Sequence, residues 1–183
     1  MKNQAGQATF SRQFAVLFLS LRMVVFFSGA PVAAASVNTA GQPIVASEAS
    51  NALDINQFLT LTNAARAEQG VAPLTLNNDL STAAQAKAQD MAAKHYWAHF
   101  RPTDNKAPWD FIKESGYTYK VAGENLARGF RTPEGITKAW LNSPTHRANL
   151  ISAKYQEVGF ASIQTVDEKG ETVLLTVQMF GSR

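Results

Sequence analysis

His99, Glu124 and His146 are the side chains of this chain that could do chemistry together. A neutral imidazole is a good ligand for a divalent transition metal, and a nearby carboxylate can ligate, accept a ring N–H or act on a bound water. If the fold brings the three together, two imidazoles would hold a metal ion such as Zn2+ with open positions. The other interpretation is that His146 hydrogen-bonds a carboxylate and only holds two loops together.

A second histidine pair is less promising. His95 and His99 have the i, i+4 spacing of a zinc pair on a helix, but Tyr96 stands where an HExxH motif carries its glutamate. Pro102 and the aromatic residues around it also argue against a continuous helix. Because the chain has no cysteine, thiolate catalysis, disulfides and cysteine-ligated metal sites are excluded.

Ser143 suggests a serine hydrolase that would use His146 and Glu124. No G-x-S-x-G motif surrounds this serine, and its place before Pro144 is typical of a turn that ends a helix. We therefore place Ser143 in the cleft without a nucleophilic role.

Helices are expected first along the chain. Residues 54–69 have helical apolar spacing, a capping-box pattern at the start and Gly70 as a stop. Asn63 and Arg66 share one side of this helix, either as an exposed polar face or as a tie to a neighbouring loop. The alanine-rich residues 78–94 predict a second helix that packs closely on a sheet. Its inward positions would be Leu80, Ala84, Ala88 and Met91.

The rest of the chain predicts a loop, two helices and a sheet. We expect a loop at 95–108, a helix at 109–114, a strand at 121–127, a helix at 133–141 and strands at 158–166 and 171–179. Residues 167–170 would turn the last two strands into a hairpin. Trp140 is expected in the core or at the rim of a groove, and Asn125 beside backbone groups of its loop. The order favours an α+β domain with helices covering an antiparallel sheet.

The first 35 residues have the layout of a secretory signal peptide. A positive start precedes an apolar run, and Ala33-Ala34-Ala35 offers a cleavage site. The alternative, an uncleaved membrane anchor, would need about 20 apolar residues, more than this run has. Residues 36–53 predict a flexible linker, and 54–183 the folded domain.

The positive charge of the chain belongs to this export segment. Residues 1–35 hold three of the 17 basic residues and no acidic one, so the mature chain has 14 of each sign and a net charge of zero. A nucleic-acid partner is therefore not expected. We expect a secreted, extracellular or periplasmic protein without a stable membrane span after cleavage.

Several short motifs, taken in order, resemble the CAP superfamily (cysteine-rich secretory, antigen 5 and pathogenesis-related 1 proteins), in its bacterial extracellular SCP-like branch. The resemblance covers residues 54–181. Its marks are Asn63-Ala64-Ala65-Arg66, Pro73-Leu74, Met91 in the alanine-rich helix, His99 with Pro102, Gly123-Glu124-Asn125, Trp140, Ser143-Pro144-Thr145-His146-Arg147, Asn149-Leu150 and Val158-Gly159.

The resemblance implies an α-β-α sandwich with a surface cleft. Family members hold two histidines and two glutamates there, and some bind zinc through the histidines. His99 and Glu124 match the first histidine and the first glutamate, and His146 is assigned the second histidine's place. The family's second glutamate would align near Ser143, where this chain has no glutamate, so the set of two histidines and two glutamates is incomplete here.

Three functions follow as hypotheses. The favoured one is a secreted, non-catalytic module that binds a ligand, lipid or surface protein at the cleft, with Zn2+ or another divalent cation on His99 and His146. The alternative is a zinc-dependent extracellular hydrolase with Glu124 as general base. The third gives Glu124 and Arg147 a structural role, because a buried, partnered charge is costly to orphan.

Overall fold

The structure, a computed structural model, describes residues 53–183, so the predicted signal peptide (1–35) and all but the last residue of the linker (36–53) lie outside the described residues. Four strands in this part form a sheet with the order β1-β3-β4-β2. Their bounds are Thr75–Leu76 for β1, Val121–Arg128 for β2, Glu157–Val166 for β3 and Thr172–Ser182 for β4. β2 and β3 run antiparallel to β4, as predicted, whereas the short β1 runs parallel to β3 and makes the whole sheet mixed.

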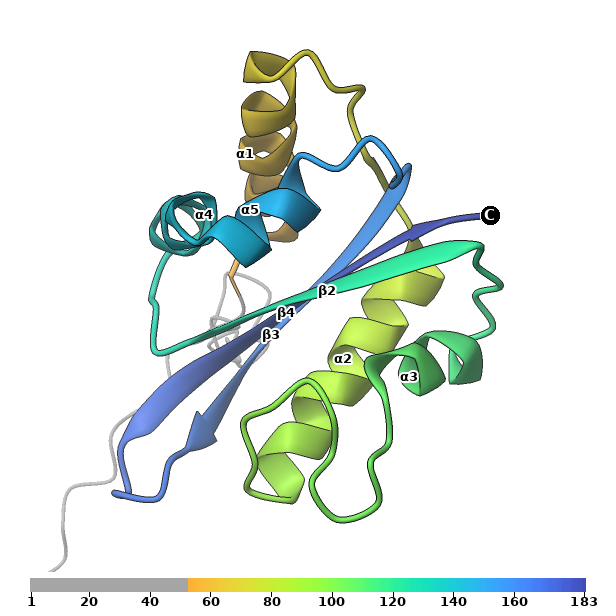
Figure 1. The fold of residues 1–183 in the computed structure, drawn as a ribbon. Helices are drawn as coiled ribbons and strands as arrows, with labels where there is room; N and C mark the ends of the chain where they lie inside the picture. The colour runs from red at the N-terminus through yellow and green to blue at the C-terminus, as the bar shows by residue number, and fades with distance from the viewer. Residues whose placement is uncertain (1–52) are drawn as a thin grey trace, which may run out of the picture. The chain divides into compact units, whose positions relative to one another are not determined.

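Helices cover both faces of this sheet (Figure 1). α2 (Asn78–Ala93) and α3 (Pro108–Glu114) lie on one face, and α1 (Ile55–Glu68), α4 (Pro133–Asn142) and α5 (Pro144–Leu150) lie on the other. The expected α-β-α sandwich is thus confirmed. Within residues 53–183, no helix combines the length and apolar character needed to cross a membrane.

Each helical layer has its own apolar core. The core under α2 holds the four predicted inward residues together with two from β4: Leu80, Ala84, Ala88, Met91, Val177 and Met179. The core on the other face is built around aromatic and branched side chains: Phe58, Ile136, Trp140, Leu150, Phe160 and Phe180. Phe58 stacks on Phe160 with ring centroids 5.3 Å apart. Trp140 is therefore a core residue, one of its two predicted places.

Proline and short polar side chains define the helix ends. Asp54 caps α1, Asn77 caps α2 and Thr132 caps α4, each through a side-chain oxygen that accepts a backbone N–H. Pro144 ends α4, as predicted, but it also begins α5, a helix that was not predicted from the sequence. A proline at the first helical position is compatible with a helix, because its missing N–H would have no intrahelical partner there.

Asn63 and Arg66 tie α1 to neighbouring loops, as one of the two interpretations predicted. The Asn63 side chain donates to the carbonyl of Leu74 and accepts from its N–H. The buried guanidinium of Arg66 donates to four carbonyls, those of Ala72 after α1, Leu150 at the end of α5, and Ser152 and Tyr155 after α5. The segment after α5 is thereby held against α1, and the cost of burying the arginine is offset by its hydrogen bonds.

Candidate functional site

Glu124, in β2, is hydrogen-bonded to His99, with Nδ1 and Oε1 2.6 Å apart. The Glu124 side chain is 1% exposed and that of His99 is 51% exposed, so the imidazole is the half of the pair that meets solvent. Burial raises the pKa of Glu124, although His99 and Lys87 act to lower it. The hydrogen bond to Glu124 raises the pKa of His99. The pair therefore holds its protons more tightly than the two free side chains would.

A buried lysine holds the loop that carries His99. Lys87, in α2, is fully buried, and its ammonium donates to the carbonyls of Ala98 and His99 and to the hydroxyl of Tyr96 at 2.9, 2.7 and 3.1 Å. All three donors of the ammonium thus reach one short loop segment. Burial lowers the pKa of Lys87, and the negative charge of Glu124 opposes this shift. Lys87 therefore fixes the backbone of His99 and places a positive charge near Glu124.

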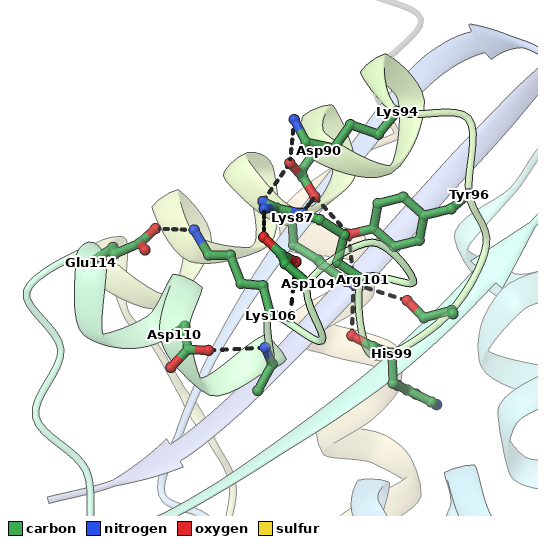
Figure 2. Close-up of polar contacts among 12 residues, drawn as sticks. Lys87, Asp90, Lys94, Tyr96, His99, Arg101, Asp104, Lys106, Asp110 and Glu114 are labelled. Carbon is green, nitrogen blue, oxygen red and sulfur yellow. Dashed lines mark hydrogen bonds and ion pairs between the residues drawn. The ribbon is translucent and has the colours of Figure 1, made fainter.

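Asp90, one turn further along α2, holds the same loop. Arg101 donates to both carboxylate oxygens of Asp90, at 2.9 and 2.7 Å, and Tyr96 donates a third hydrogen bond at 2.7 Å. Figure 2 shows these residues gathered between α2 and the loop, next to Lys87. The loop at 95–107 is thus irregular but pinned to α2 through side chains at several points.

β2 is an edge strand, and carbonyls on its unpaired side accept hydrogen bonds from side chains of α4, α5 and the segment after α5. Tyr155 donates to the carbonyl of Ala122, Asn149 to that of Glu124, and Trp140 to that of Leu126. An open strand edge invites pairing with another chain, and these caps block it.

Gly123 leaves room for one of those capping residues. A Cβ at this position would lie 2.3 Å from the Tyr155 hydroxyl. The glycine beside Glu124 is therefore explained by the ring that packs against it rather than by a backbone that only glycine adopts.

His146 reaches the site from α5, on the other helical layer. Its Nδ1 lies 2.9 Å from the hydroxyl of Ser143, and its backbone carbonyl accepts a hydrogen bond from Asn125 at 3.3 Å. Burial lowers the pKa of His146, and the charge of His99 lowers it further. The two imidazoles are thus close enough to interact electrostatically, one from each side of the β2 edge.

An open hollow of about 310 Å3 lies beside the His99–Glu124 pair. Its lining residues are His99, Phe100, Pro108, Trp109, Ala122, Gly123, Glu124, Asn149 and Tyr155. Of the four predicted cleft residues, His99 and Glu124 line this hollow, whereas His146 and Ser143 do not.

Arg147 does not pair with Glu124. Its guanidinium donates to the Gln69 side chain at 3.1 Å, next to the C-terminal end of α1. The carboxylate of Glu124 is instead partnered by His99. Both residues of the third hypothesis thus make contacts between elements, each with a different partner.

The fold and the cleft define a class of protein, an α-β-α sandwich with a histidine–glutamate pair at the edge of its sheet. Residues 59–180 match the model of the CAP family, described as the cysteine-rich secretory protein family. The chain belongs to this family.

Two curated proteins of Bacillus subtilis are similar in sequence to this chain. The chain is 38% identical over 142 residues to "Uncharacterized protein YkwD" of Bacillus subtilis. The aligned residues make up 73% of this chain and 55% of that relative. The chain is 29% identical over 103 residues to "Uncharacterized membrane protein YlbC" of the same organism, covering 56% of this chain and 30% of the relative. The chain thus spans about half, or less, of the length of the curated relatives that it matches.

Two solved structures share the fold. An extracellular protein containing an SCP domain from Bacillus anthracis has a TM-score of 0.59 at 24% identity, covering 70% of this chain and 40% of that one. An outer surface protein from Borrelia burgdorferi has a TM-score of 0.59 at 20% identity, covering 72% of this chain and 97% of that one. At these identities the likeness concerns the fold alone.

Proposed function

We propose that this chain is an exported, non-catalytic binding module whose ligand or surface partner occupies the cleft beside His99 and Glu124, helped by a divalent metal ion. The observation that carries the proposal is a half-exposed imidazole held by a buried carboxylate at the mouth of a hollow. A preformed hollow with a few convergent polar groups is the usual form of a ligand site. Export is supported by the signal-peptide layout of residues 1–35.

The donor set fits an open metal site made by two histidines. Both Nδ1 atoms are engaged inside the protein, with Glu124 and Ser143, which leaves Nε2 of each ring as the candidate ligand atom. A carboxylate on the far nitrogen of an imidazole is the usual support for a metal-binding histidine. Among residues 53–183, no group of three histidine, aspartate or glutamate side chains lies close enough together to bind one metal ion. Water or the ligand itself would complete the coordination, and the metal would act as a Lewis acid.

Titration calorimetry of the purified chain with Zn2+ tests the metal. We expect binding at neutral pH that is lost in His99→Ala and in His146→Ala, and that weakens in acid because protonated imidazoles cannot ligate. His95→Ala is the matched control, because His95 is exposed in the same loop. No binding by the wild-type chain, or equal binding by His99→Ala, would contradict this part of the proposal.

The zinc-dependent hydrolase, with Glu124 as general base, is the second candidate. It is less well supported, because one oxygen of Glu124 is held by His99 and the other is shielded from solvent. Assays with peptide, ester and nucleic-acid substrates distinguish the two. Turnover that disappears in both His146→Ala and Glu124→Gln would favour the hydrolase over the binding module.

A further inference from the structure

The hollow beside His99 has one aromatic wall. Phe100 is 47% exposed although its ring is large and apolar, and it lines the hollow together with Pro108 and Trp109 from the start of α3. Exposed aromatic side chains around a depression are a frequent mark of a ligand surface.

The hollow also has polar lining groups, but most of them are already paired. Asn149 donates both amide hydrogens, to the carbonyl of Glu124 and to Asn125, and the Tyr155 hydroxyl donates toward the carbonyl of Ala122. What remains exposed is the outer part of the His99 ring, since the side chain of its partner Glu124 is only 1% exposed. Oε2 of Glu124 is buried and has no hydrogen-bond partner in the described part of the chain. Because Oε2 is shielded from solvent, the half-exposed imidazole of His99 is the polar group of the pair that a ligand hydroxyl can reach.

The charge of the lining residues and the volume of the hollow restrict which ligands it can bind. None of the residues that line the hollow is a lysine or an arginine, so a phosphate or carboxylate ligand would find no fixed cation there. The volume of about 310 Å3 is at the small end of ligand pockets and is enough for one compact ring. The hollow therefore fits an uncharged ligand ring that has an apolar face and several hydroxyl groups.

We propose that this hollow binds one pyranose ring of an uncharged glycan, with the ring face against Trp109 and Phe100 and a hydroxyl group at the His99–Glu124 pair. The inference rests on the proposed function, because it names the ligand class of the same cleft. The C–H face of the sugar packs on the aromatic wall, and its hydroxyls exchange water for protein partners. Glycoside hydrolysis typically needs two carboxyl groups that flank the bond, and Glu124 is the only carboxylate among the lining residues. The glycan is bound and not cut.

Calorimetry of the EDTA-treated chain with chitotetraose and with cellotetraose tests the proposal. We expect one of them to bind, and Trp109→Ala and Phe100→Ala each to weaken that binding by about tenfold. Phe130→Ala is the matched control, because Phe130 is 37% exposed but lines a different depression. It should leave glycan binding unchanged.

The same variants separate this proposal from the metal site. Trp109→Ala should still bind Zn2+ like the wild-type chain, because it removes no imidazole. Failure of both sugars to bind, or equal binding by Trp109→Ala, overturns the glycan assignment whatever the Zn2+ titration gives. Saturable binding of phosphatidylcholine vesicles that is lost in Phe100→Ala, with no sugar binding, would also overturn it and assign the aromatic wall to a lipid surface.

Discussion

The carboxylate of Glu124 is buried, and the two basic side chains that act on it come from different elements. His99 touches it directly, and Lys87 acts on it through space. A buried charge is tolerated only with such partners, so the protonation of His99 and the charge of Glu124 depend on each other.

Glu124→Gln should lower the pKa of His99. The hydrogen bond to Glu124 is the largest cause that raises this pKa, while burial and the charge of Lys87, which lower it, remain in the variant. NMR titration of the His99 imidazole measures the change. Asp104→Asn removes an exposed carboxylate of the same loop and should leave the His99 pKa where it is. A His99 pKa that stays raised in Glu124→Gln would show that another group sets it.

At the scale of elements, side chains of α2 position the loop that carries His99. Asp90 and Lys87 are three residues apart on α2 and both hold this loop. Because the loop has no regular backbone ladder between Lys94 and Ala107, these side chains supply the order that a helix or strand would otherwise give. Removing one of them should loosen the loop before it unfolds the domain.

Asp90→Asn should lower the melting temperature at neutral pH but not in strong acid. Burial would raise the pKa of Asp90, but hydrogen bonds from Arg101 and Tyr96 outweigh it, so the pKa lies below its ordinary value of 3.8. A depressed carboxyl pKa gives stability that is present above the unfolded value and is lost as pH falls through the folded value. The lost hydrogen bonds to a charged group correspond to about 1.5–3 kcal/mol.

Thermal melts of wild type and Asp90→Asn between pH 2 and pH 7 measure this. The difference should be largest above the ordinary carboxyl pKa of 3.8 and should shrink as the pH falls through the lower folded-state pKa of Asp90. Asp79→Asn removes an exposed carboxylate at the start of α2 and is the control, with little change expected. A difference that persists in acid would mean that Asp90 stabilises the loop without its charge.

The sequence predicted the elements whose signals are local. Asp54 and Thr132 mark helix starts by capping chemistry, and the β-branched runs around residues 167–170 mark a hairpin. β1 was missed because two residues carry no periodicity, and α5 because Pro144 was assigned only the role of ending α4. Both omissions concern short elements whose existence depends on tertiary contacts.

The candidate site was predicted in part, for a similar reason. Residue types and the family resemblance indicated His99 and Glu124, and the structure brings them into contact. Lys87 was missed, although its place beside Ala84, Ala88 and Met91 on the buried face of α2 was a usable signal. Tyr155 was missed because nothing local in the sequence shows that a side chain from the segment after α5 caps an edge strand more than thirty residues away.

On the scale of the whole domain, the site lies at the β2 edge, where the two helical layers meet. His99 belongs to the α2 side and His146 to the α5 side, and each layer packs on the sheet through its own core. The spacing of the two imidazoles therefore depends on how closely each layer approaches the sheet. Gly159, in β3, sets that approach for α2, because a Cβ there would lie 2.2 Å from the backbone of Leu80 and Ser81.

Gly159→Ala should therefore move α2 away from the sheet. Backbone atoms cannot yield as a flexible side chain does, so we expect a loss of about 1–3 kcal/mol of stability or more, measured by urea unfolding. Because α2 carries Lys87, the His99 loop should shift with it, and the pKa of His99 should fall toward its ordinary value as the contact with Glu124 lengthens.

Gly135→Ala is the matched control, since it adds the same methyl group within α4. Its Cβ would meet the Thr132 hydroxyl at 3.3 Å, which is tight but not prohibitive, and alanine is favoured over glycine inside a helix. This control should be nearly neutral in stability and should leave His99 unchanged. If Gly159→Ala instead unfolds at the same urea concentration as the wild-type chain, the approach of α2 to the sheet is not limited at Gly159. The link from helix packing to the spacing of the two histidines would then fail as well.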